Sequence, residues 1–106
     1  MKTTMKTNTT LRALIVRHPF VDQLLDGSKT VEYRSRPTRI RGTIGLIASG
    51  ERGKLLGLID IVDCREDARY GYAWVVRNPR KFAVPVEFAQ RYGCVTWVNV
   101  TDARLP

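Results

Sequence analysis

Short apolar segments separated by turn residues constrain the fold of this chain more than any other feature. Most of them are rich in β-branched and aromatic residues and are shorter than an ordinary helix. They predict strands at residues 12–17, 30–35, 43–49, 55–64, 72–77 and 94–100. The polar residues 65–71 are expected to form a connection, and Asn78 and Pro79 to end the strand before them. Pro85 disfavours a central strand position for residues 83–87, because proline cannot donate a backbone hydrogen bond to a neighbouring strand.

One segment near the N-terminus has helical spacing instead. Pro19 suits the first helical position, and Asp22 lies near the positive end of such a helix. The apolar residues that share one stripe are Phe20, Val21, Leu24 and Leu25. Gly27 follows and favours a helix end, so the sequence predicts a two-turn helix with one buried face.

The chain has 106 residues, which suits a single domain, and 43% of them are hydrophobic, which is enough for one core. Residues 1–10 are polar and are predicted to form a disordered tail, which leaves residues 11–106 as the domain. Five or six strands with one or two short flanking helices indicate an α+β fold. The expected architecture is a small, mostly antiparallel β-barrel with its helices packed outside.

Charge is the property that departs most from average composition. Lys and Arg exceed Asp and Glu by eighteen to ten, which gives a formal net charge of +8 and favours polyanionic partners. The alternative is a surface that only keeps the protein soluble. The cations are concentrated in residues 29–41, where Lys29, Arg34, Arg36, Arg39 and Arg41 surround the acid Glu32. The sequence therefore favours a nucleic-acid partner for this region.

Several other classes of protein are disfavoured. Cys64 and Cys94, with one histidine in the chain, provide neither a disulfide framework nor a conventional zinc site, and both are expected to be reduced and buried. No apolar segment follows the polar N-terminus, as a secretory signal would require. The apolar run at residues 55–62 is far shorter than the roughly 20 residues of a membrane helix. We therefore expect a cytoplasmic protein without a metal, a cofactor or a membrane partner.

A short motif after the helix carries the strongest functional signal. Gly27, Lys29, Glu32 and Arg34 form the pattern G-x-K-x-x-E-x-R, which average residue usage would produce in a chain of this length roughly once in a thousand times. Gly27 lets the chain reverse, and strand alternation sends Glu32 and Arg34 to one face. A carboxylate between two cations can orient both toward a phosphate or a base edge. Glu32 is expected to organise this site and, at most, to act as a general base.

The motif resembles the signature of the ASCH domain family (activating signal cointegrator homology), whose barrel is related to the PUA RNA-binding domain. Further matching residues follow in the family's order: Arg17, Pro19, Phe20, Pro37, Arg41, Gly42, IASG, YAWVVRNPRKF, Pro85 and Trp97. They extend the resemblance over residues 11–100. The resemblance implies a PUA-like barrel with a basic cleft between the barrel and its helix, lined by Lys29, Glu32 and Arg34.

Further residues in the same region are assigned to ligand binding, and each also has a simpler structural explanation. Arg36, Arg39 and Arg41 can contact a phosphate backbone, but a solvated loop explains them almost as well. The resemblance places Arg17 ahead of the helix and His18 beside the cleft, although capping or packing is the favoured role of His18. An exposed ion-pair cluster, worth about 0–1 kcal/mol per pair, is the alternative for the motif itself.

Three other side chains complete the set of assignments. Ser49, at the end of a strand, is either a hydroxyl of the cleft or an ordinary strand-end serine. Tyr33 shares a strand face with Val31 and is expected in the core, as are most aromatic residues of the second half, with one or two left to stack on a base. Asp60 interrupts an apolar strand, but alternation can send it outward, so no catalytic role is assigned to it.

Taken together, these patterns predict a nucleic-acid-binding module, above all for RNA. The alternative is a small hydrolase that uses the same cleft. Some ASCH relatives are amidohydrolases that act on acetylated cytidine with a lysine and a threonine of the signature, and Glu32 here occupies the place of that threonine. Other relatives are reported as ribonucleases, and for that reaction Lys29, Glu32 and Arg34 would be the catalytic residues. A third possibility is binding of a modified nucleoside or a small anion without turnover.

Overall fold

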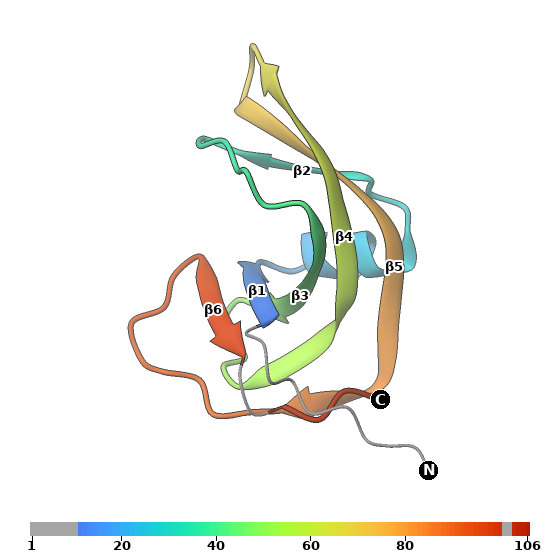
Figure 1. The fold of residues 1–106 in the computed structure, drawn as a ribbon, viewed down its shortest axis with the longest axis vertical. Helices are drawn as coiled ribbons and strands as arrows, with labels where there is room; N and C mark the ends of the chain where they lie inside the picture. The colour runs from blue at the N-terminus through green and yellow to red at the C-terminus, as the bar shows by residue number, and fades with distance from the viewer. Residues whose placement is uncertain (1–10, 101–102) are drawn as a thin grey trace.

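The computed structural model describes residues 11–100 and 103–106, which form a six-stranded sheet and one helix (Figure 1). The elements are β1 (Leu11–Val16), α1 (Phe20–Asp26), β2 (Val31–Arg34), β3 (Gly42–Ala48), β4 (Lys54–Asp67), β5 (Gly71–Glu87) and β6 (Trp97–Val100). The strands lie in the order β2-β5-β4-β3-β1-β6. β1 and β3 pair in parallel and the other neighbours are antiparallel, so the predicted α+β class with a mostly antiparallel sheet is confirmed. The predicted tail at residues 1–10 lies outside the described residues.

The helix packs on the sheet through the stripe that its spacing predicted, with one exception. Val21, Leu24 and Leu25 are buried in a core that also contains residues of β1, β3, β4 and β5. Gly27 has a φ of 85°, in the left-handed region that glycine adopts without strain, and it ends the helix as expected. Phe20 was expected in the buried stripe, but it is exposed. It is the first residue of a seven-residue helix and lies at the rim of a cleft rather than over the sheet.

β4 and β5 form a hairpin that is longer than the sequence pattern indicated. Pairing continues out to Asp67 and Gly71, so the connection predicted at residues 65–71 shrinks to residues 68–70. The polar residues of this segment remain in strand conformation because the two chains pair with each other beyond the core, where both faces can be hydrated.

Asn78 and Pro79 were expected to end a strand, but they lie within β5. Asn78 has a φ of 58°, and the register against β4 shifts between Arg77 and Arg80, which leaves an extra residue on β5. Such a bulge removes residues from the hydrogen-bond ladder and therefore accommodates a proline inside a strand. Pro85 lies farther along β5, outside the part that pairs with β2, so the expectation that it avoids a central position is met.

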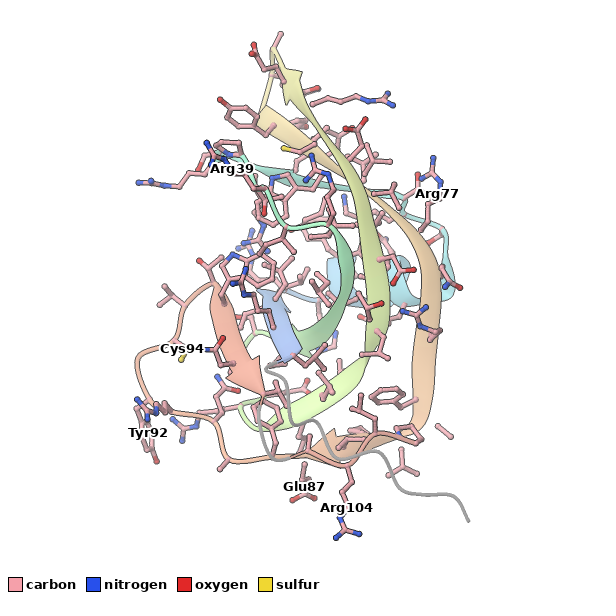
Figure 2. All side chains as sticks on the ribbon, in the orientation of Figure 1. Arg39, Arg77, Glu87, Tyr92, Cys94 and Arg104 are labelled. Carbon is pink, nitrogen blue, oxygen red and sulfur yellow. The ribbon has the colours of Figure 1, made fainter. Side chains whose placement is uncertain are left out.

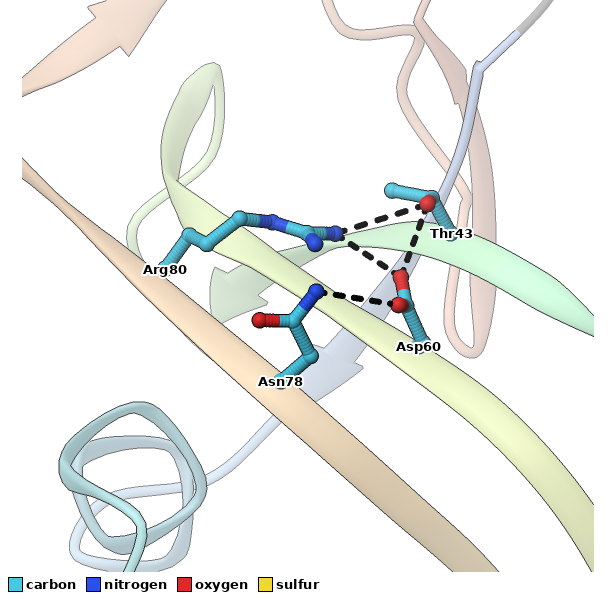
Figure 3. Close-up of polar contacts among 4 residues, drawn as sticks. All are labelled: Thr43, Asp60, Asn78 and Arg80. Atoms are coloured by element: carbon cyan, nitrogen blue, oxygen red, sulfur yellow. Dashed lines mark hydrogen bonds and ion pairs between the residues drawn. The ribbon is translucent and has the colours of Figure 1, made fainter.

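A polar cluster joins three strands beside this bulge (Figure 3). Asp60 on β4 accepts hydrogen bonds from Arg80 at 2.8 Å, from Thr43 at 2.7 Å and from Asn78 at 3.3 Å. The hydrogen bond from Arg80 above all, with smaller contributions from Thr43 and Asn78, lowers the pKa of Asp60, although partial burial opposes the shift. The cluster therefore fixes β3, β4 and the irregular part of β5 to one another.

The sheet curls so that its two ends approach each other. In Figure 1 the long strands β4 and β5 bend along their length. Trp74 of β5 and Trp97 of β6 stack with their ring centroids 5.9 Å apart, although three strands separate β5 from β6 in the sheet order. Arg34 of β2 donates a hydrogen bond from Nη2 to the carbonyl oxygen of Ile15 on β1 at 3.0 Å. These two contacts span the interior between distant strands.

Two further expectations concern cysteines and membranes. Cys64 and Cys94 were expected to be reduced and buried; both are free, and both are only partly buried. Cys64, on β4, and Cys94, in the loop before β6, each pack at the margin of a hydrophobic cluster. Among the described residues, no helix combines the length and the hydropathy that crossing a membrane requires.

Candidate functional site

A cleft of about 710 Å³ lies where the ends of the curled sheet approach each other. Its walls come from the end of β1, the start of α1, β2, the end of β3, and the loops before β5 and β6. Five of the residues assigned to binding from the sequence line it: Arg17, Lys29, Glu32, Arg34 and Ser49. The fold therefore brings together side chains from five separate segments of the chain.

Glu32 and Arg34 form a partly buried ion pair at the floor of this cleft. Glu32 is 7% exposed, and its Oε2 accepts a hydrogen bond from Arg34 Nε at 2.8 Å. The Arg34 guanidinium also donates to Ile15 and lies 5.8 Å from the centre of the Trp74 ring. The two side chains share one strand face, as alternation predicted. Because this face points inward, the pair is not the exposed surface cluster that was the alternative reading.

Lys29 takes a different position from the one the motif suggested. Its backbone N–H donates to the carbonyl oxygen of Gln23 at 3.1 Å, which fixes the chain just after the helix. Its Nζ lies 5.1 Å from the ring centre of Tyr33 and 5.5 Å from that of Phe20. The expectation that Glu32 holds both cations is met for Arg34, whereas the described contacts of the Lys29 ammonium are with aromatic faces.

Two tyrosines form an exposed aromatic wall on one side of the cleft. The ring centroids of Tyr33 and Tyr70 lie 4.6 Å apart with an interplanar angle of 40°, and the residues are 41% and 47% exposed. The prediction that Tyr33 belongs to the core is wrong. Alternation correctly separated Tyr33 from Glu32, but β2 is an edge strand whose inward face is the one that carries Glu32. A large exposed aromatic pair is suited to stacking on a planar ligand.

Sequence reasoning did not single out Tyr70, although a signal was present. Tyr70 is an aromatic residue inside the polar connection REDARYG, where it contributes to no apolar periodicity. An aromatic side chain placed on a short polar turn has little core to join, and such positions often carry function. Arg69 beside it places its guanidinium carbon 5.1 Å from the Tyr70 ring centre.

His18 lies at the start of α1 and bridges two acids, outside the lining of the cleft. Its Nδ1 is 2.6 Å from Asp22 Oδ2, and its Nε2 is 2.8 Å from Glu51 Oε2. A neutral imidazole has one N–H, so two carboxylate acceptors favour the doubly protonated ring. The hydrogen bonds to Asp22 and then to Glu51 raise the pKa of His18. The favoured role, capping or packing, is wrong on both counts, because Pro19 occupies the N-cap of a helix without a side-chain cap, and the His18 side chain is exposed.

The arginines after the motif lie on the connection between β2 and β3, and the structure does not place them among the residues that line the cleft. Arg41 donates to the carbonyl oxygens of Thr38 and Ile40 at 3.1 and 2.9 Å. Figure 2 shows Arg39 pointing outward from this connection. The carbonyl oxygen of Arg36 accepts a hydrogen bond from Trp74 Nε1 at 3.0 Å, which ties the connection to β5. Phosphate contacts by Arg36, Arg39 and Arg41 stay predictions.

The chemistry of the cleft follows from these side chains. Three cations, one carboxylate that is already paired, one serine and three aromatic residues, two of them tyrosines, line it together with apolar residues. Within the described part of the chain, no group of three or more His, Cys, Asp or Glu side chains is placed to hold a metal ion. The arrangement suits a ligand that is both anionic and aromatic.

Comparison with known proteins gives one informative result. A family model described as the ASCH domain matches residues 14–95, which is more than half of the chain and includes all the residues that line the cleft. A search of curated proteins finds no match. The resemblance seen in the G-x-K-x-x-E-x-R motif is thereby confirmed, and the chain belongs to the ASCH domain family.

Proposed function

We propose that this ASCH domain is a nucleic-acid-binding module, above all for RNA, and that its ligand occupies the cleft described above. The observation that carries the proposal is the meeting of Arg17, Lys29 and Arg34 with the exposed Tyr33–Tyr70 pair in one cavity. Nucleotides combine a phosphate with a planar base, and this cavity offers a partner for each. The general association of the ASCH family with RNA binding supports the same reading.

Each side chain has a role in this proposal. Arg34 has five N–H donors, and the ion pair with Glu32 fixes the plane of its guanidinium, so its remaining donors can meet a phosphate without a large loss of side-chain entropy. Lys29 and Arg17 supply further positive charge at the walls. Tyr33 and Tyr70 supply the surface for a base. Glu32 therefore acts as a positioning residue.

The curl of the sheet also bears on the type of fold. We propose that it is a PUA-like barrel whose opening, between β2 at one end of the sheet and the β1–β6 pair at the other, is the ligand cleft. The side-chain hydrogen bond from Arg34 to Ile15 bridges that opening. A ligand at this position would contact both ends of the sheet at once.

A hydrolase remains the second candidate, because the fold supplies a hydroxyl that the motif lacks. Ser49 and Lys29 line the same cleft, so a nucleophile and a cation both reach the proposed ligand site. Incubation with RNA and with acylated nucleosides, followed by mass spectrometry, tests this candidate. A cleaved product that the parent forms and Ser49→Ala does not form would establish the hydrolase. Unchanged substrates would favour binding without turnover.

The binding proposal is tested with single-site variants that leave the Glu32–Arg34 pair intact. Fluorescence anisotropy with a labelled single-stranded RNA should show weaker binding for Lys29→Ala and for Arg17→Ala. If either cation neutralises one phosphate, the slope of log affinity against log salt should fall by about 0.7. Arg104→Ala is the matched control, since this exposed arginine does not line the cleft. Equal affinity in all three variants and the parent would contradict the proposal.

A further inference from the structure

A second hollow of about 430 Å³ continues from the cleft. The two share Ile15, Ser49 and Val95, so they adjoin at a common rim. The second hollow extends over the turn between β3 and β4 and toward the loop that precedes β6. In Figure 2, Tyr92 and Cys94 mark the course of this loop.

The second hollow shares the positive charge of the first. Arg52 and Arg91 line it, and no carboxylate is among its described lining residues. The guanidinium carbon of Arg52 lies 3.5 Å from the ring centre of Tyr92, which is 82% exposed. A ring this exposed contributes little to the core. A guanidinium stacked on one face of the ring can fix its orientation and leave the other face open to a ligand. The hollow therefore has positive charge, and the exposed ring of Tyr92 adjoins it through Arg52 without lining it.

Backbone and side-chain hydrogen bonds hold the two walls of the second hollow together. Gly53, next to Arg52, donates its N–H to Gln90 Oε1 at 2.8 Å and accepts a hydrogen bond from Phe88 N–H at 3.0 Å. Gly53 has a φ of 81°, which suits glycine and lets the turn approach the loop closely. The two segments that carry Arg52 and Tyr92 are thus held together before a ligand arrives, which reduces the entropy lost on binding.

We propose that the cleft and the second hollow form one continuous track for a single strand of nucleic acid, so that the ligand is an oligonucleotide rather than a free nucleotide. The proposal rests on the proposed function and extends it by naming the ligand class. One base stacks against Tyr33 and Tyr70, the backbone crosses the shared rim at Ser49 and Val95, and a later base reaches Tyr92. A duplex is excluded from this mode, because its bases are stacked inside and cannot lie on exposed side chains.

The test is a length series of oligouridylates, from uridine monophosphate to about eight nucleotides, which falls within the site sizes of small single-strand binders. Affinity of the parent should rise as the strand grows long enough to span both hollows. Tyr92→Ala should reduce affinity for the longest strand roughly 5- to 150-fold, the range for loss of one stacked base, and leave binding of the monophosphate unchanged. Tyr92→Phe should retain the affinity, because the stacking face is kept.

Charge is tested separately with matched double variants. Arg52→Ala with Arg91→Ala should remove the gain from length and lower the salt slope for the long strand. Arg77→Ala with Arg104→Ala removes the same charge elsewhere, and Figure 2 shows both of these residues far from Tyr92. The control pair should preserve the gain from length. Oligodeoxyuridylates of equal length show whether the 2′-hydroxyl contributes.

The outcomes separate this inference from the proposed function. If the monophosphate binds and affinity does not change with length, or if Tyr92→Ala binds every length normally, the track is refuted and the first cleft stands. If neither the monophosphate nor any strand binds, both proposals are refuted. Circular dichroism of each variant confirms that the comparison is between folded proteins.

Discussion

Arg34→Ala gives the sharpest test of how the cleft is built. The substitution removes the cation from Glu32, whose side chain is 10% exposed, while the lost Arg34 side chain is 23% exposed. Breaking a buried ion pair costs about 3–5 kcal/mol, because a charge is left without its partner. Since water can partly reach this pair, we expect a loss of about 2–3 kcal/mol in the free energy of unfolding. In a domain of this size the midpoint of thermal unfolding should fall by roughly 8–20 °C.

The chain contains a matched control for this effect. Arg65 Nε binds Asp63 Oδ2 at 2.7 Å with the same two-residue spacing on a strand, but these side chains are 71% and 40% exposed. Arg65→Ala should therefore cost only about 0–1 kcal/mol. Urea unfolding followed by circular dichroism measures both variants on one scale. A loss in Arg34→Ala no greater than that in Arg65→Ala would refute the reasoning.

A double variant separates the ion pair from its packing. Replacing both partners, as in Glu32→Leu with Arg34→Met, removes the unpaired charge and keeps apolar volume at the site. This variant should be more stable than Arg34→Ala and should still lose affinity for RNA. If the double variant were the less stable of the two, lost packing rather than an uncompensated carboxylate would explain the single substitution.

Three further predictions follow from local contacts. The pKa of His18 should exceed its ordinary value of 6.5 in an NMR titration, and Asp22→Asn with Glu51→Gln should return it toward that value. The stability that protonated His18 contributes is fully present below pH 6.5 and is lost as pH rises through the raised pKa of the folded state. A His18 pKa at or below 6.5 would contradict the bridge to the two acids. Because the pKa of Asp60 is lowered in the folded protein, the stability contributed by its carboxylate is present above pH 3.8 and is lost as pH falls through the folded-state pKa. Asp60→Asn should therefore destabilise the protein more at neutral pH than in acid. An equal loss at both pH values would argue against that ion pair. Gly57→Ala should cost about 1–3 kcal/mol, because a Cβ there would lie 2.5 Å from a carbonyl oxygen of β5, and unchanged urea unfolding would show that the strand can move aside.

The sequence alone determined the secondary structure around the site and which of its side chains share a face. The spacing of Val21, Leu24 and Leu25 indicated a helix, Gly27 marked its end, and strand alternation put Glu32 and Arg34 on one face. These features depend on the periods of helix and strand and on the backbone freedom of glycine, which are properties of neighbouring residues. The family could be recognised for the same reason, since its signature is a local pattern.

The tertiary structure decided which face of that strand is buried and what surrounds it. Alternation gives only relative orientation, so the inward direction of Glu32 and the exposure of Tyr33 depend on the edge position of β2. Ser49 and Tyr70 enter the cleft because the sheet curls, and neither is near the motif in sequence. Likewise, Asn78 lies inside a strand because a bulge and the Asp60 cluster stabilise it there. Contacts between distant segments set these outcomes. A local pattern can nominate a residue such as Ser49, but it cannot fix which other side chains will surround it.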